Sequence, residues 1–342
     1  MSEPEAASSE RPPESGSAPS STAPAQAPQD GTAPWRLIWL AVPLLGLTEL
    51  GAQLWVSHRA PSADDWSAVS GPVRELRKPG DLVVVAPEWQ GPNARREFGD
   101  ELMPLRDVAR ADATSYQRAI EISTLGDTLP EFRDWPIVER RSEGAFELLV
   151  HENPNPAVVK FDFLEELKPK RAEAYTYDPG VGREQRTLCH FNFNSRVSSG
   201  NLGGPPTFPR ERFQCPGGDA YFVGVTVIDD SHEYRPKRCI WANPTPTGPI
   251  GITFREVPLG KVIRGFGELP WVLERQYNGP PIVLSVRVAG QEIGRFEHHD
   301  GEGWRGFEFP LGALAGRTED VEFEVSSSMA RERYFCFQAD SR

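Results

Sequence analysis

The chain has 342 residues, of which 38% are hydrophobic and 10% aromatic, enough for about two domains with packed cores. The formal net charge of -12 would repel a phosphate backbone, and no Lys/Arg block with interleaved aromatic residues offsets it, so we expect no nucleic-acid partner. The chain holds 33 Pro and 31 Gly, and its helical patterns lie mainly before residue 135. We therefore expect an α+β protein of several domains, rich in strands toward its C-terminus.

Residues 1–34 contain no Ile, Leu, Val, Phe, Tyr or Trp and consist largely of Ser, Pro, Ala and Glu. Such a segment cannot bury enough apolar surface to offset the entropy that is lost when it becomes ordered. We expect a disordered tail in the cytoplasm.

Residues 35–57 contain the only long apolar run, from Leu37 to Val56. As a helix rising about 1.5 Å per residue, this run would extend about 30 Å, the thickness of a bilayer's hydrocarbon core. Tryptophan lies near both ends, at positions 35, 39 and 55. The pattern predicts one transmembrane helix. The alternatives are a buried helix of a soluble domain and a signal peptide, and the acidic tail without a basic n-region argues against the latter.

The orientation of this span depends on cysteine, because Arg36 and Arg59 balance each other on its two sides. All four cysteines follow the span, and their even number in a strand-rich region is typical of disulfides formed in an oxidising compartment. We therefore expect a single-pass protein of the cytoplasmic (inner) membrane, with residues 60–342 outside the cytoplasm.

Glu49 and Gln53 interrupt the apolar run at i, i+4 spacing, and Gly46 lies one turn earlier. A stripe of small and polar residues favours packing against another helix, either in a second copy or in a multi-span partner. The alternative is a protonated or snorkelling Glu49 that the bilayer tolerates.

Residues 62–156 alternate between helix and strand signals and predict a small α/β layer domain. Helical periodicity from Trp66 to Leu76 follows N-cap residues, and the β-branched run from Asp81 to Ala86 predicts a strand that is buried on both faces. Further predicted elements are a helix over 92–103, a strand over 119–124 and an antiparallel pair over 137–141 and 145–152.

Glu88 follows the predicted buried strand, at the edge where α/β sheets place their ligands. It is the best candidate for a binding or catalytic carboxylate in this domain, and the alternative is a charge at a helix N-terminus. Neither a G-x-G-x-x-G fingerprint nor a P-loop follows the strand, so we expect no nucleotide and no other cofactor.

The order DDWSAVSGPVRELRKPGDLVVVAPEW, residues 64–89, resembles the extracytoplasmic segment that follows the last spans of multi-pass bacterial membrane glycosyltransferases that use lipid-linked sugars. That family carries its catalytic acid between membrane helices, whereas a single span is expected here. The resemblance implies an accessory role near envelope glycan assembly and not transferase activity.

Residues 157–342 show period-two alternation, clearest where Ile282, Leu284 and Val286 point to one face of a strand. About ten strands with short polar turns predict an antiparallel β-sandwich. The other candidate strands are 186–193, 210–215, 221–228, 238–242, 250–257, 261–266, 293–297, 307–309, 321–325 and 334–339.

Residues 282–339, which include GEGWRGFEFPLGALAGRTEDVEFEVSSS and RYFCFQA, resemble a galactose-binding-type jelly roll. That scaffold occurs in many carbohydrate-binding modules and also hosts binders of other molecules. The resemblance implies a β-sandwich with a possible glycan ligand.

The alternation also orients the cysteines. Cys189 and Cys215 each share a strand face with phenylalanines, so the two thiols point to an apolar side and could meet in the core. Cys239 and Cys336 then form the second predicted disulfide. Zinc is the competing interpretation, but no cysteine pair has C-x-x-C spacing and His190 is the only nearby imidazole, so we expect no metal site.

Four large aromatic residues could form a flat surface on which a sugar stacks, although such residues belong more often to a core. They are Trp241, Trp271, Tyr277 and Trp304. Two acidic clusters with histidine, near residues 229–233 and 298–302, are more often solvated turns than calcium or other metal sites. No nucleophile-base motif assigns a catalytic residue.

Three functions fit these patterns. The leading hypothesis is a non-catalytic envelope protein that binds a glycan or a partner protein. The second is a glycan hydrolase or transferase that uses Glu88 or the cluster at 229–233. The third is an accessory subunit recruited to a membrane glycosyltransferase complex through the face that carries Glu49.

Overall fold

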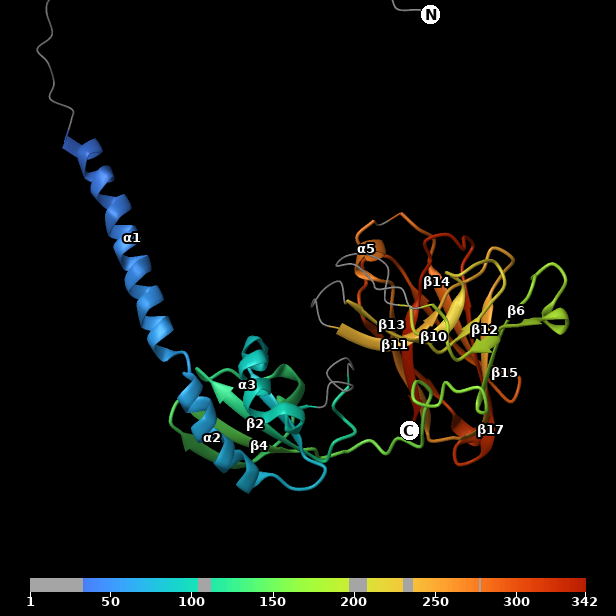
Figure 1. Ribbon diagram of the computed structural model, residues 1–342, viewed down its shortest axis with the longest axis horizontal. Coiled ribbons are helices and arrows are strands. Elements are labelled where there is room, and N and C mark those ends of the chain that lie inside the picture. The colour runs from blue at the N-terminus through green and yellow to red at the C-terminus, as the bar shows by residue number, and fades with distance from the viewer. Residues whose placement is uncertain (1–32, 104–111, 197–207, 230–235, 277) are drawn as a thin grey trace, which may run out of the picture. The chain divides into compact units, whose positions relative to one another are not determined.

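The computed structural model describes residues 33–103, 112–196, 208–229, 236–276 and 278–342 (Figure 1). The chain divides into two units, residues 1–58 and residues 59–342. In the first unit the described element is the helix α1 (Ala33–Arg59).

The predicted transmembrane helix is wrong. Among the helices that the structure describes, none is both long and apolar enough to cross a bilayer. The described side chains of α1 include the polar residues Thr48, Glu49 and Gln53, which break the apolar run into short pieces. The described apolar side chains of α1 are exposed, and Leu45 has 71% of its surface accessible.

The expected α+β class is also wrong, because the described part of the chain is mostly β, with many more residues in strands than in helices. Beyond α1, helix is confined to short segments, since Pro and Gly punctuate the chain too often for longer ones. The helical segments of the second unit are α2 (Ala63–Leu76), α3 (Gly91–Phe98), α5 (Trp271–Glu274), η1 (Glu88–Gln90), η2 (Gly99–Glu101), η3 (Pro130–Phe132), η4 (Arg183–Gln185) and η5 (Gly312–Leu314).

A four-stranded sheet with the order β1-β2-β4-β3 forms the first layer of the second unit, as the α/β pattern predicted. β1 and β2 are parallel, and the remaining pairs are antiparallel. β1 is buried along its whole length, which confirms the expected buried strand. The bounds are β1 (Leu82–Ala86), β2 (Arg118–Thr124), β3 (Ile137–Glu143) and β4 (Phe146–Glu152).

α2 and α3 cover one face of this sheet (Figure 1). Trp66, Val69 and Val73 on α2 pack with alternate residues of the strands, and Ser62 with Asp65 forms a capping box that starts the helix. The opposite face is named the helix-free face because none of the described α-helices covers it; it carries Leu82, Val84 and Ala119, covered by Phe132 and its neighbours.

Two further sheets form a β-sandwich, as predicted for the C-terminal half. The eight-stranded sheet has the order β16-β13-β18-β11-β10-β9-β8, with β5 paired to β18, and the six-stranded sheet has the order β15-β14-β17-β12-β6-β7. The bounds are β5 (Phe161–Asp162), β6 (Ala172–Thr176), β7 (Thr187–Leu188), β8 (His190–Asn192), β9 (Arg212–Gln214), β10 (Phe222–Asp229), β11 (Pro236–Ala242), β12 (Ile250–Pro258), β13 (Val262–Glu268), β14 (Ile282–Val288), β15 (Gln291–His298), β16 (Arg305–Pro310), β17 (Thr318–Ser326) and β18 (Cys336–Ser341).

The main core lies between these two sheets, where alternate residues such as Ile240, Ile252 and Phe323 pack together. The outer face of the eight-stranded sheet carries a second, smaller core around Phe222, Trp241 and a disulfide. Both faces of this sheet are therefore apolar over part of their area. The expected boundary between residues 156 and 157 stays a prediction.

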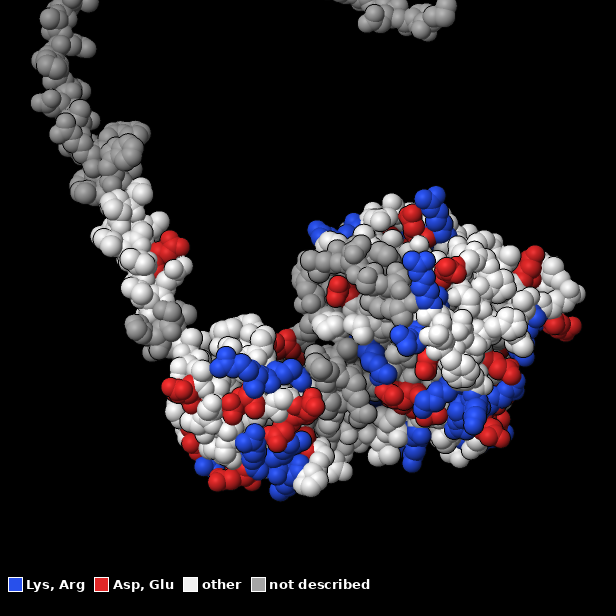
Figure 2. All heavy atoms as spheres, viewed as in Figure 1, with Lys and Arg blue, Asp and Glu red and all other residues white. Residues whose placement is uncertain are grey.

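The two disulfides join the cysteines that the alternation pattern paired. Cys189 bonds Cys215 inside the main core, and Cys239 bonds Cys336 on the outer face of the eight-stranded sheet. All four residues are buried. On the face shown in Figure 2, acidic and basic side chains intermingle over the described surface.

We predict that replacing Cys239 and Cys336 with Ser lowers the free energy of unfolding more than replacing Cys189 and Cys215. The Cys239–Cys336 disulfide joins residues 97 positions apart, and the Cys189–Cys215 disulfide joins residues 26 positions apart. The longer loop restricts the unfolded chain more, by about 1 kcal/mol in the chain-entropy account. Denaturant unfolding of the two double variants measures both losses of free energy. Equal losses, or a larger loss for the Cys189/Cys215 variant, would contradict the prediction.

Candidate functional site

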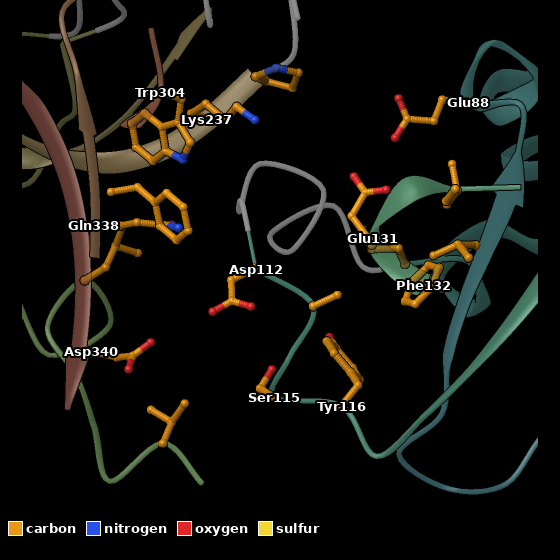
Figure 3. A pocket seen from close by; sticks show the side chains of 18 of the residues that line it. Glu88, Asp112, Ser115, Tyr116, Glu131, Phe132, Lys237, Trp304, Gln338 and Asp340 are labelled. Atoms are coloured by element: carbon orange, nitrogen blue, oxygen red, sulfur yellow. The ribbon is translucent and has the colours of Figure 1, made fainter. Parts of the chain in front are cut away.

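The second unit contains a pocket of about 780 Å³ (Figure 3). One wall is formed by β1 at the edge of the four-stranded sheet, the start of α3 and the segments that cover the helix-free face, and the other is the outer face of the eight-stranded sheet. Pockets for small molecules typically enclose about 300 to 1,000 Å³ and occur preferentially between layers or domains. The size and place of this pocket therefore fit a ligand of a few rings.

The wall on the four-stranded sheet presents carboxylates beside apolar groups. Glu88 follows the carboxyl end of β1 in the short helix η1, and Glu131 lies in η3 next to Phe132. Both carboxylates are exposed, whereas Phe132 is buried. Figure 3 shows Glu88 and Glu131 on the same side of the pocket, and Tyr116 lies below them.

The wall on the eight-stranded sheet presents aromatic rings and donors. Phe266 and Trp304 lie parallel, with ring centroids 6.3 Å apart and an interplanar angle of 4°. Lys237 and Gln338 project from β11 and β18 beside them (Figure 3). The Trp304 Nε1–H is buried and has no hydrogen-bond acceptor among the described residues. This wall thus combines two stacked aromatic rings with polar groups.

An ionic cluster joins the two walls at one end of the pocket. Arg342 Nη1 lies 2.8 Å from Asp112 Oδ2 and donates to Thr114 Oγ1 at 2.8 Å, and Arg264 Nη1 lies 3.8 Å from the same Asp112 oxygen. Arg342 also pairs with Asp340. Because these side chains are largely buried, their attraction is screened less than that of surface pairs.

The two carboxyls of this cluster have opposite pKa shifts. Burial raises the pKa of Asp112, but hydrogen bonds from Thr114 and the charges of Arg342 and Arg264 outweigh it, so the net pKa is lowered. Burial dominates at Asp340 and, together with the nearby Asp112 and Asp162, raises its pKa in spite of the Arg342 partner.

The structure brings two of the predicted site residues together, since Glu88 and Trp304 line the same pocket. Trp241 instead stacks on Phe222 in the outer-face core and is 1% exposed, as the core interpretation expected. Trp271 lies in α5 beneath the Arg275 guanidinium, outside the pocket lining. Tyr277 lies outside the described residues.

The remaining candidates do not join this site. Gly46, Glu49 and Gln53 lie on α1, and their role in a helix contact stays a prediction. Of the cluster at 229–233 the structure describes Asp229 alone, which is exposed. His298 is buried against Glu274, and His299 pairs with Glu297 at the surface. Within the described ranges, no group of three or more His, Cys, Asp or Glu is arranged to hold a metal ion.

Several pocket residues escaped the sequence analysis. Phe266 and Lys237 occupy outward positions of β13 and β11, and an aromatic residue at an outward position, as at Phe266, was a usable signal. Glu131 lies in the three-residue helix η3, Asp112 lies in a loop and Arg342 follows β18, and no periodicity orients a side chain at these positions.

Comparison with known proteins gives no family. No family model matches the chain, and no curated protein matches its sequence. Among solved structures, CBM51 from Clostridium perfringens GH95 in complex with methyl-galactose is 7% identical with a TM-score of 0.24, over 34% of this chain and 81% of that chain. The CBM51-2 and INT domains from Clostridium perfringens ZmpB are 7% identical with a TM-score of 0.27, over 77% of this chain and 47% of that chain.

A third structure, CBM51-2 in complex with GlcNAc and INT domains from the same ZmpB, is 5% identical with a TM-score of 0.26, over 34% of this chain and 25% of that chain. The chain thus spans less than half the length of the two ZmpB structures. TM-scores this low support no conclusion about the fold or the ligand of this chain. The sandwich rests on the strand pairing of this chain.

We predict that Asp112→Asn lowers the free energy of unfolding at pH 7 by about 1 to 3 kcal/mol, because Arg342 would lose a buried anionic partner. The folded-state pKa of Asp112 is lowered. Its stabilisation is therefore fully present above the unfolded pKa, about 3.9, and is lost as the pH falls through the folded pKa. Denaturant unfolding at several pH values should show that the free energies of unfolding of the unmodified chain and of Asp112→Asn converge in acid. The exposed Asp134→Asn serves as the control, and a gap that does not shrink in acid would contradict this account.

Proposed function

We propose that this protein binds a glycan in the pocket between the four-stranded and eight-stranded sheets, without turning it over. The observation that carries the proposal is the composition of the two walls, with the parallel rings of Phe266 and Trp304 on one side and the carboxylates of Glu88 and Glu131 on the other.

Sugars need both kinds of surface. The C–H faces of a pyranose ring pack on flat aromatic side chains, and its hydroxyl groups need fixed hydrogen-bond acceptors and donors. Carboxylates supply acceptors, and Lys237 and Gln338 supply donors. The volume of about 780 Å³ accommodates a ligand larger than one sugar ring.

A binding role is favoured over catalysis by the state of the carboxylates. Glycoside hydrolysis needs two carboxyl groups at a set separation, one of them a proton donor with a raised pKa. Asp340 has a raised pKa, but its Oδ1 accepts from Arg342 Nε at 2.6 Å, which occupies it. Glu88 and Glu131 are exposed. The enzyme alternative would gain support if the full chain released product from a glycan and Glu88→Gln abolished that release.

We also propose that residues 59–342 work in an oxidising compartment outside the cytoplasm. The support is that all four cysteines, each within the described residues, take part in disulfides.

A second candidate function is an accessory subunit that is held by a partner helix against α1. The specific observation in its favour is the exposure of apolar side chains on α1, including Leu44, Leu47 and Leu50 at 54% or more. Gly46, Glu49 and Gln53 would form the contact. Crosslinking of the full chain that is unaffected by replacing Glu49 and Gln53 with Leu would remove this candidate.

We predict that the full-length protein captures glycans from an array and that Trp304→Ala weakens capture by about tenfold or more, because the stacking ring and its buried area are lost. Trp271→Ala is the matched control, since it removes a partly buried tryptophan that does not line the pocket. Its binding should stay within about twofold of the unmodified chain, well under the 1.4 kcal/mol that a tenfold change represents.

Thermal unfolding of both variants separates loss of a contact from loss of the fold. Glycan capture that survives Trp304→Ala, or an array on which no glycan binds, would overturn the proposed function.

A further inference from the structure

We infer that two buried Glu–His pairs, Glu121–His151 and Glu274–His298, position the two walls of the pocket. The inference deepens the proposed function, because the pocket that the pairs shape is the proposed glycan site. It assigns roles to four buried residues that do not line the pocket themselves.

The first pair lies on the helix-free face of the four-stranded sheet, behind the wall that carries Glu131. His151 Nε2 and Glu121 Oε2 are 2.8 Å apart, and their side chains are 4% and 0% exposed. Glu121 Oε1 accepts the backbone N–H of Leu129 at 2.5 Å. The Phe132 ring stacks on the His151 ring, with centroids 5.5 Å apart.

These contacts fix the turn that forms the wall. Leu129, Glu131 and Phe132 all line the pocket, and two of the three contact the pair directly. Ser123, two residues after Glu121 on β2, donates to the Asp127 carbonyl at 2.6 Å and holds the start of the same turn. The turn is therefore attached to the sheet through polar side chains of β2 and through the face of an imidazole.

The second pair repeats this arrangement behind the opposite wall. Glu274 Oε1 lies 2.5 Å from His298 Nε2 and accepts the Leu269 N–H at 3.0 Å. Glu274 Oε2 accepts the Gly301 N–H at 2.5 Å, three residues before Trp304. A buried carboxylate thus holds the turn that leads into the aromatic wall.

Stability alone does not account for these residues. A buried carboxylate on a central strand loses its hydration, and apolar residues of similar volume are often as stable or more so. The neighbours Leu82, Val84 and Ala119 show that the helix-free face accepts apolar side chains. An apolar residue at 121 would, however, leave the Leu129 N–H without its acceptor. Neither pair reaches the pocket surface, so these are positioning residues and not catalytic ones.

The test measures glycan affinity in the full-length protein with the glycan that gives the strongest array signal, alongside hydrogen–deuterium exchange of residues 125–136. Glu121→Leu should weaken binding on the order of tenfold and speed exchange in that segment, because a buried donor loses its partner. Glu121→Gln keeps an acceptor oxygen for Leu129 and should restore both toward the unmodified values. Glu274→Leu should weaken binding similarly and speed exchange around Gly301.

Glu324→Leu is the control, since Glu324 is also buried and bonded to Tyr177 but lies on the six-stranded sheet, away from the pocket. It should lower the melting temperature and leave affinity unchanged. If Glu121→Leu does not fold, Leu129→Pro compared with Leu129→Ala removes the same N–H, at a φ of -75° that proline accepts.

Equal affinities for Glu121→Leu and Glu324→Leu, or equal exchange of residues 125–136 in Glu121→Leu and the unmodified chain, would overturn the inference. Hydrogen–deuterium exchange tests the inference even if no glycan binds, because it needs no ligand. Failure of the proposed function is therefore distinguishable from failure of this inference.

Discussion

The eight-stranded sheet is buried over part of both of its faces, and the rest of the second unit is arranged around this constraint. Its inner face packs on the six-stranded sheet to form the main core. Its outer face carries Phe222, Trp241 and the Cys239–Cys336 disulfide, and beyond them the aromatic wall of the pocket. A sheet that is apolar on its outer side needs a cover, and part of that cover is the four-stranded sheet with its turns. The pocket lies where this cover does not close completely on the sheet.

This arrangement explains why the pocket combines different chemistries. Each wall comes from a separate sheet, and the segments that line it lie far apart along the chain, from Glu88 to Arg342. The strands supply rigid positions for Phe266 and Gln338, whereas the short helix η3 supplies Glu131 and the loop before β16 supplies Trp304. Turns are less constrained than strands, and here buried carboxylates accept their backbone N–H groups. The ion pair of Arg342 with Asp112 then joins the walls.

The sequence predicted the parts that depend on local alternation. Period two identified β14 and β17, placed Cys189 and Cys215 toward one core and led to both disulfides. The prediction of a transmembrane span was wrong for α1, because Glu49 and Gln53 were interpreted as a contact stripe within a span, whereas together with Thr48 they interrupt its apolar run. The sequence predicted only two pocket residues, Glu88 and Trp304. Tertiary contacts decide which sheet packs against the outer face of another, and local periodicity does not report them. Tryptophan count alone could not separate Trp304 from the buried Trp241.

The most direct test of the central claim is to locate a bound glycan on the molecule. A photoreactive form of the glycan selected by the array would be crosslinked to the full-length protein, and the labelled peptides would be mapped. The account predicts labels on both walls, in peptides that contain Glu131 and Trp304, which competition by the unmodified glycan removes. Competed labels confined to the six-stranded sheet, or to residues outside the pocket, would contradict it.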